Sequence, residues 1–371
     1  MDELKYSTTK VLAIYLPQYH ETEFNNKYWG KGYTEWTACK DAKPLFPGHK
    51  QPRVPYEYYD LSNYKAIDKQ ANLAREYGID GFAIYQYYSC GNKLLEKPTE
   101  LLLKHKEIDI SYCLYWANES WENRWYGQEA KVIWEQKYGG EEEWEKQFYY
   151  CLNFFDDERY IKIENKPVYI IYKDWNFKSV YKFIDCWNKL AKENGFDGIY
   201  FIKTVAAGNT DNPGIFNASF EREPFYTLTH NLPLIPRYYR YFRTRIVEKL
   251  NKAVLMKKGK GIIQYKMDYD YCCSRIENHK LPYGSRTIPG LFTDWDNSPR
   301  RQFNCTMFSN VTTERFEKCF DIQYQKATKY GCPFVIINAW NEWGEGNYLE
   351  PDELYGDSFL KAIKQVKQRR G

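Results

Sequence analysis

Short apolar runs, most of them followed by a longer amphipathic segment, constrain the fold of this chain more than any other feature. The expected strands cover residues 11–16, 79–88, 110–116, 168–172, 198–205, 216–225, 290–294 and 333–340. The helical spacing of apolar residues predicts helices at residues 61–77, 94–106, 141–155, 177–194, 312–330 and 357–368. Strands that alternate with helices pair in parallel, and eight of them predict an α/β fold, a (β/α)8 barrel of the TIM type.

A doubly wound open sheet is the alternative for such a pattern. That fold usually carries a glycine-rich phosphate loop after its first strand, but residues 15–20 read Tyr-Leu-Pro-Gln-Tyr-His and contain no glycine. The length of 371 residues fits one barrel with an insertion. We expect residues 1–371 to form a single domain, in which residues 226–288 are a basic, Tyr- and Arg-rich insertion between strands six and seven.

The formal charge of +4 is too small to favour a nucleic acid partner, so none is expected. The excess is local, because residues 237–260 hold nine Lys or Arg and only one acid, Glu248. This segment has two interpretations: a solvated helix face, or a surface that contacts an anionic membrane or a lipid-linked glycan. Aromatic residues make up 19% of the chain, which predicts a cleft or surface lined by Tyr and Trp.

The ten cysteines form no Cys-x-x-Cys pair, and several lie in apolar runs, so reduced and buried thiols are expected. Charges of both signs precede the first apolar run, unlike a signal peptide, and no apolar stretch is long enough to span a bilayer. These features predict a cytoplasmic protein. The acid-x-acid pairs Asp268/Asp270 and Asp294/Asp296 are weak signals, so we expect neither a metal nor a cofactor.

Polar and aromatic residues follow most of the expected strands, where a barrel builds its active site. Rings pack on the C–H faces of sugars, while amides and carboxylates bind sugar hydroxyls, so this mixture suits a carbohydrate substrate. His20 has the alternative of holding a loop, and Glu119 the alternatives of a catalytic or a structural role. The predicted substrate-binding residues are Gln18, His20, Glu35, Trp36, Tyr87, Trp116, Asn118, Glu119, Asp294, Asp296, Asn341 and Trp343.

Glu342 and Glu345 are the predicted catalytic pair, directly after the last apolar strand. Glycosidic bonds are cleaved by two carboxyl groups with different roles, and neighbouring indoles raise the pKa of at least one by desolvation. Alternatively, one Glu caps the following turn or pairs with Arg300 or Arg301.

Five segments carry a resemblance to a known family: residues 13–20, 29–36, 116–119, 294–301 and 338–346. The last two read Asp-Trp-Asp-Asn-Ser-Pro-Arg-Arg and Asn-Ala-Trp-Asn-Glu-Trp-Gly-Glu-Gly. They resemble the WbsX-like family, which is similar to glycoside hydrolase family 99 and is often encoded with O-antigen or capsule biosynthesis genes. The resemblance spans roughly residues 10 to 365 in the family's order.

The resemblance implies a (β/α)8 barrel and retaining chemistry in which the substrate's 2-hydroxyl is the nucleophile, through a 1,2-anhydro sugar. It further implies that Glu342 is the general base for that hydroxyl and that Glu345 is the general acid for the leaving oxygen. The first-strand region differs from that of the hydrolase family, so specificity for mannose is not carried over.

Three functions follow from these observations. The first is a retaining glycoside hydrolase or transglycosylase that acts on a bacterial-type surface polysaccharide or oligosaccharide. The second is a glycosyltransferase of O-antigen or capsule assembly that uses an activated donor, favoured by the basic segment at residues 237–260 and opposed by the lack of a nucleotide-binding signature. The third is a non-catalytic glycan-binding protein. The sugar, the linkage and the oligomeric state are left open.

Overall fold

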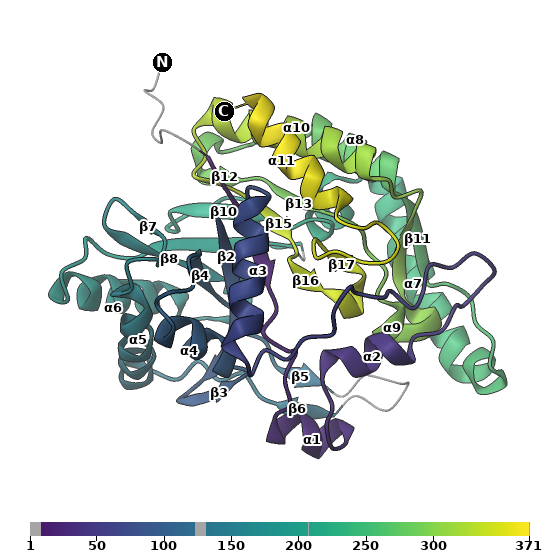
Figure 1. Cartoon of the computed structure of the whole chain (residues 1–371), viewed down its shortest axis with the longest axis horizontal. Helices are drawn as coiled ribbons and strands as arrows, with labels where there is room; N and C mark the ends of the chain where they lie inside the picture. Colours follow the sequence, from purple (N-terminus) through teal and green to yellow (C-terminus); the bar gives the residue numbers. More distant parts are fainter. Residues whose placement is uncertain (1–8, 123–130, 207, 371) are drawn as a thin grey trace.

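The computed structural model describes residues 9–122, 131–206 and 208–370, and in them nine parallel strands form a nearly closed barrel (Figure 1). Neighbours around the barrel follow the order β12-β10-β9-β8-β4-β2-β1-β15-β13. The predicted α/β barrel is therefore confirmed. These strands are β1 (Lys10–Tyr15), β2 (Gly81–Ser89), β4 (Ser111–Trp116), β8 (Lys166–Ile171), β9 (Tyr200–Val205), β10 (Ala218–Glu221), β12 (Thr287–Ile288), β13 (Gly290–Phe292) and β15 (Phe334–Asn338).

The seventh strand position is divided at Pro289, and its two halves join the two edges of the sheet. β12 pairs with β10 through Thr287 and Ile288, whereas β13 pairs with β15 from Gly290 onward. Proline lacks the N–H group that a central strand donates, so the ladder breaks at this residue. A Cβ on Gly290 would lie 1.9 Å from the carbonyl oxygen of Glu221, so glycine is required where the two edges approach.

Helices cover the outside of the barrel, and their ends follow local capping chemistry. The helix expected at residues 61–77 begins at Tyr64, because the Asn63 side chain accepts from the N–H of Lys65. The helix at 312–330 ends at Gly331, whose left-handed φ of 65° suits glycine. The covering helices are α3 (Tyr64–Glu76), α4 (Lys97–Lys104), α5 (Glu141–Phe155), α6 (Val180–Glu193), α10 (Thr313–Tyr330) and α11 (Ser358–Arg370).

Shorter elements occupy the connections. The helices are α1 (Glu23–Trp29), α2 (Glu35–Asp41) and α9 (Ser298–Arg301). The strands are β3 (Asn92–Leu94), β5 (Trp121–Glu122), β6 (Val132–Trp134), β7 (Lys162–Ile163), β14 (Thr306–Ser309), β16 (Asn341–Glu342) and β17 (Asn347–Tyr348).

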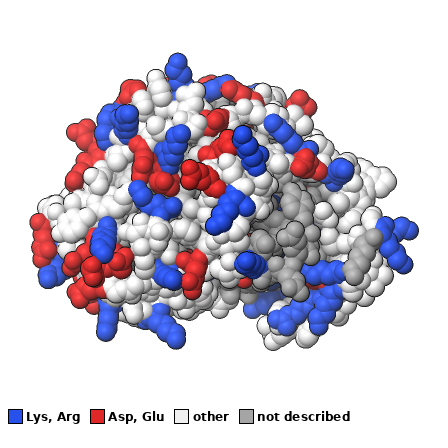
Figure 2. All heavy atoms as spheres, turned by 90° about the horizontal axis from the view of Figure 1, so that it is seen from below, with Lys and Arg blue, Asp and Glu red and all other residues white. Residues whose placement is uncertain are grey.

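Between β10 and β12 the chain forms α7 (Leu234–Leu250), β11 (Tyr265–Asp268) and α8 (Tyr269–Asn278), with β11 paired in parallel to β14 outside the barrel sheet. Figure 2 shows basic side chains gathered toward the right-hand end, the end that holds α7 in Figure 1, while both signs mix elsewhere on this face. That residues 1–371 form one domain with an insertion at 226–288 stays a prediction.

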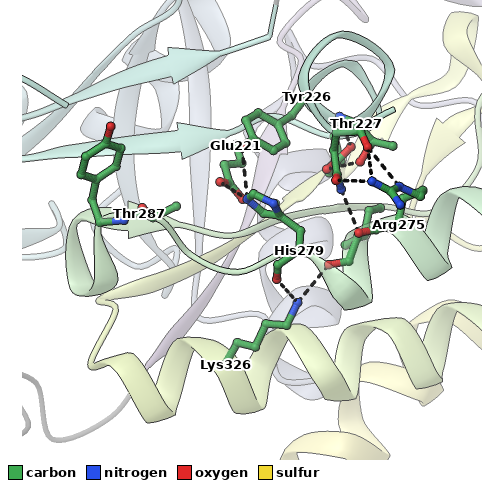
Figure 3. Close-up of polar contacts among 12 residues, drawn as sticks. Glu221, Tyr226, Thr227, Arg275, His279, Thr287 and Lys326 are labelled. Carbon is green, nitrogen blue, oxygen red and sulfur yellow. Dashed lines mark hydrogen bonds and ion pairs between the residues drawn. The ribbon is translucent and has the colours of Figure 1, made fainter. Parts of the chain in front are cut away.

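A polar cluster fastens this region to the barrel (Figure 3). The buried carboxylate of Glu221, at the end of β10, contacts Nε2 of His279 at 2.9 Å. Lys326 of α10 donates to the carbonyl of the same His279 at 2.8 Å, and Arg275 of α8 donates to the carbonyl of Asn231 at 2.6 Å. These contacts hold α8 and the residue that follows it against β10, α10 and the segment at Asn231.

All ten cysteines lie in the described part of the chain as free thiols, eight of them buried. No helix within the described residues is both long enough and apolar enough to cross a bilayer. Residues 1–8, which precede the first apolar run, lie outside the described residues. The predicted cytoplasmic location stays a prediction.

Candidate active site

A cleft of about 820 Å³ opens at the carboxyl ends of the barrel strands. Gln18 follows β1, Tyr87 lies late in β2, and Glu119 follows β4. The connections after β13 and β15 contribute Arg300 and the predicted pair Glu342 and Glu345. Part of the cleft wall also comes from α7, which contributes Arg240, Thr244 and Glu248.

Glu342 and Glu345 lie on a tight hairpin. β16 and β17 pair in an antiparallel manner, with Glu342 opposite Asn347, and a 3₁₀ turn from Trp343 to Glu345 joins them. Gly346 follows in the left-handed region, at a φ of 61°. The hairpin brings two glutamates that are three residues apart to the same cleft.

Arg300 of α9 holds three carboxylates together. Its Nη2 lies 3.2 Å from Oε2 of Glu342 and 2.6 Å from Oε1 of Glu35, while its Nη1 lies 2.9 Å from Oε1 of Glu345. The pairing with Arg300 that we considered as an alternative for one Glu is thus present for both. It does not remove them from the cleft, because both glutamates also line it.

Burial raises the pKa of two of the carboxyl groups that contact Arg300, those of Glu342 and Glu35. Desolvation, reinforced by the charge of Glu345, raises the pKa of Glu342 to about 8, although Arg300 opposes the shift. Desolvation also raises the pKa of Glu35, which is completely buried, and Arg300 again opposes it. Such a carboxyl is a stronger base than an ordinary glutamate once it is ionised.

Gly344 is required by the close approach of these groups. A Cβ at this position would lie 1.9 Å from Oε1 of Glu35 and 2.7 Å from Nε of Arg300. The hairpin backbone therefore packs directly on the ion pair between Glu35 and Arg300. That contact fixes the position of Glu342 and Glu345 relative to Arg300.

Two further contacts anchor the hairpin. The amide of Asn341 accepts from the N–H of Leu16 at 2.7 Å and donates to the carbonyl of Leu16 at 3.0 Å, which ties the hairpin to the end of β1. The indole of Trp343 donates to Glu350 at 2.6 Å. Glu350 also accepts from Tyr59 and Gln70, and burial raises its pKa to about 7.

Of the twelve predicted substrate-binding residues, Gln18, Tyr87 and Glu119 line the cleft. Glu119 pairs there with Lys173 at 2.5 Å. The other nine are buried outside the cleft lining: His20, Glu35, Trp36, Trp116, Asn118, Asp294, Asp296, Asn341 and Trp343. The structure thus separates the predicted set into a cleft surface and a layer behind it.

Most residues of the buried layer have identifiable protein partners. The indole of Trp36 donates to the carbonyl of Tyr59 at 2.8 Å and that of Trp116 to the carbonyl of Tyr88 at 2.9 Å, while Asn118 bonds both the N–H and the carbonyl of Lys173. Burial lowers the pKa of His20 to about 4, which favours the neutral imidazole.

The acid-x-acid pairs are also occupied by protein groups. Asp294 pairs with Arg53 at 2.7 Å, and Asp296 contacts His49 at 2.8 Å and Gln51 at 2.9 Å. Asp268 accepts from the N–H of Tyr271 at the start of α8, and Asp270 pairs with Arg315. Within residues 9–122, 131–206 and 208–370, no group of three His, Cys, Asp or Glu side chains is placed to hold a metal ion.

Comparison with known proteins identifies the family to which this chain belongs. The family described as "Glycosyltransferase WbsX" matches residues 11–363. The chain belongs to the WbsX family. Two curated relatives, both uncharacterized proteins WxcX from strains of Xanthomonas campestris pv. campestris, are 29% identical to it over 366 residues. The alignment covers 97% of this chain and 50% of theirs, so this WbsX family member spans about half the length of these relatives.

Solved structures share its fold. An endo-α-mannosidase of glycoside hydrolase family 99 from Bacteroides thetaiotaomicron superposes with a TM-score of 0.56 at 13% identity, over 97% of this chain and 96% of that one. A protein described as glycoside hydrolase-like gives a TM-score of 0.58 at 12% identity, over 97% and 94% of the two chains. WbsX membership and this barrel together support a carbohydrate-active enzyme.

Several residues of this WbsX family site carry no sequence signal that singles them out. Glu350, Tyr59 and Gln70 form the network under Trp343, yet they lie in separate segments without a motif. Arg222, a further cleft residue, follows β10 and points its guanidinium at the hydroxyl of Tyr85 at 3.2 Å. Only the position of Arg222 at a strand end could have indicated it.

Proposed function

We propose that the chain makes or breaks glycosidic bonds in a bacterial-type surface polysaccharide by retaining chemistry, with Glu342 and Glu345 as the catalytic pair. One observation carries the proposal: both carboxylates line one cleft at the strand ends and share Arg300. A cleft with rings such as Trp29, Tyr87 and Trp121 in its wall suits a sugar chain.

In the proposed mechanism Glu342 takes the proton of the substrate's 2-hydroxyl while that oxygen attacks the anomeric carbon. The glycosidic bond breaks, and Glu345 gives its proton to the leaving oxygen. Water or another hydroxyl then opens the 1,2-anhydro sugar with the two roles reversed, so the configuration is retained. The raised pKa of Glu342 supports the first role, because a carboxylate whose pKa lies near the working pH is an effective base.

Arg300 has a positioning role in this mechanism. Its guanidinium separates Glu342 from Glu35 and Glu345, and its positive charge favours the ionised form of Glu342. Without it, repulsion among three carboxylates would keep Glu342 protonated and unable to accept a proton.

A second candidate is transfer from an activated, phosphate-bearing donor. Arg222, Arg240 and Arg301 all line the cleft, and guanidinium groups bind phosphate oxygens in a bidentate manner. In that case Glu342 would activate an acceptor hydroxyl. A third candidate, a non-catalytic glycan-binding protein, needs the aromatic cleft but not the paired carboxylates.

A mass-spectrometric turnover screen separates these candidates. Wild type, Glu342→Gln and Glu345→Gln are incubated with mannose-, rhamnose- and fucose-containing oligosaccharides, with and without nucleotide sugars. Glu193→Gln, on the exposed side of α6, is the matched control. Cleavage without a nucleotide sugar that is lost only in the two cleft variants supports the proposal.

Product that grows only when a donor is added moves the chain to the transferase class. Glycan binding without turnover across the whole panel contradicts both enzymatic candidates.

A further inference from the structure

The helix α7 exposes an unusually apolar face. Ile235 is 83% exposed, and seven other large side chains on the same helix are also exposed to solvent. Scattered apolar residues on a surface need no explanation, but a contiguous patch on one element marks an interaction site. These eight side chains, which we term the α7 outer face, are Leu234, Ile235, Tyr238, Tyr239, Tyr241, Phe242, Ile246 and Leu250.

The helix is inverted relative to an ordinary surface helix. Its one buried residue is Val247, and the residues near that side of the helix, Arg240, Thr244 and Glu248, line the cleft. With 3.6 residues per turn, Ile235, Phe242 and Ile246 fall on the opposite side. A helix of a water-soluble protein normally places its apolar stripe inward and its polar residues outward. Here the polar side lines the cleft, and no residue among those that the structure describes covers the apolar side.

Basic residues accompany the apolar ones. Arg245, Lys249 and Lys252 are exposed on or beside the α7 outer face. Arg245 lies 4.3 Å from the ring centre of Tyr241, and neither Arg245 nor Lys249 forms an ion pair with another described residue. The one acid of the helix, Glu248, belongs to the cleft wall and pairs with Lys252. The basic end of the molecule in Figure 2 includes this region.

We propose that the α7 outer face docks on an anionic membrane surface. Apolar and Tyr side chains enter the headgroup region, while Arg and Lys beside them contact anionic headgroups. A second copy of the chain fits less well, because a symmetric contact between two such faces would bring Arg245 and Lys249 against like charges. This inference goes beyond the proposed function and does not rest on it. Because α7 also forms a cleft wall, docking would set the cleft beside the lipid surface.

Vesicle sedimentation with the full chain tests the proposal. We expect wild type to bind vesicles of phosphatidylcholine with added phosphatidylglycerol, and to bind phosphatidylcholine alone much more weakly. The Arg245→Gln/Lys249→Gln variant should bind the anionic vesicles roughly thirtyfold more weakly, at about fivefold per charge. The Ile235→Ser/Phe242→Ser/Ile246→Ser variant should lose binding, and because these side chains are exposed, its thermal unfolding should match wild type.

Matched controls come from α6, at the other end of the molecule in Figure 1. Tyr181→Ser and Lys182→Gln/Lys189→Gln change exposed residues of the same kinds and should leave vesicle binding unchanged. The proposal is overturned if wild type does not bind anionic vesicles, or if the α7 and α6 variants bind equally. A stable dimer in light scattering that the Ile235→Ser/Phe242→Ser/Ile246→Ser variant dissolves, without vesicle binding, would assign the face to a second copy instead.

Discussion

Replacement of Arg300 by Met tests whether one guanidinium holds the carboxylates of the site together. Glu35 is the most sensitive of them, because its side chain is fully buried and lies 2.6 Å from Arg300. Removal of one partner from a buried ion pair costs about 3–5 kcal/mol. The charge left on Glu35 can be removed by protonation, and for an ordinary carboxyl that costs at most about 5 kcal/mol at pH 8 but only about 1 kcal/mol at pH 5.

The sign of the pH dependence follows from this limit. Loss of Arg300 raises the pKa of Glu35 in the folded state further above its unfolded value, because Arg300 is the group that lowers it. Stability is therefore kept at low pH and lost as the pH rises. We expect Arg300→Met to lower the free energy of unfolding by about 3 kcal/mol or more at pH 8 and by about 1 kcal/mol at pH 5.

Urea titrations of wild type and variant at both pH values measure this difference. The packing lost with the Arg side chain contributes equally at the two pH values, so the difference between them isolates the charge. A double variant, Arg300→Met/Glu35→Gln, should recover most of the loss at pH 8. Equal losses at pH 5 and pH 8 would refute the reasoning, as would a loss below about 1 kcal/mol at pH 8, typical of an exposed pair.

Three other predictions concern the hairpin. For an aryl glycoside, whose leaving group departs without protonation, kcat/KM should rise roughly tenfold from pH 7 to pH 9 as Glu342, with a pKa of about 8, ionises; a falling pH–rate profile would assign it as the acid instead. Gly344→Ala should lower kcat/KM by about a hundredfold, because its Cβ would displace Glu35 and Arg300, and unchanged kinetics would disprove that contact. Glu350→Gln should cost about 1–3 kcal/mol in urea unfolding, because its amide nitrogen would face a donor, and an unaffected midpoint would contradict the network.

The strands were predictable where their neighbours in the barrel bury both faces. Residues 333–340 are apolar except for Asn338, and the structure has β15 within them. The seventh strand was only half predicted, at residues 290–294, because the two residues of β12 before Pro289 are too short for a pattern to show.

The candidate site was predictable only in part, because local spacing does not contain its long-range contacts. Glu342 and Glu345 are adjacent to a strand end, so the position of the pair follows from the pattern. The contact between Glu35 and Arg300 joins residues 265 positions apart, and only the closed barrel brings them together. Likewise, the apolar spacing of α7 shows that the helix has two faces but not which of them faces the protein.

The division of the seventh strand gives the barrel a seam. Only two residue pairs join β12 to β10, whereas six join β2 to β4. Opening free energies vary within a protein, and the units with the fewest shared hydrogen bonds open first. The amides of Thr287 and Ile288 should therefore exchange with deuterium earlier than those of β2. A barrel that opens at this seam would loosen the connection between β10 and β12, which includes α7 and its cleft residue Arg240, before the rest of the sheet unfolds, so partial opening would remove part of the cleft wall while most of the fold persists.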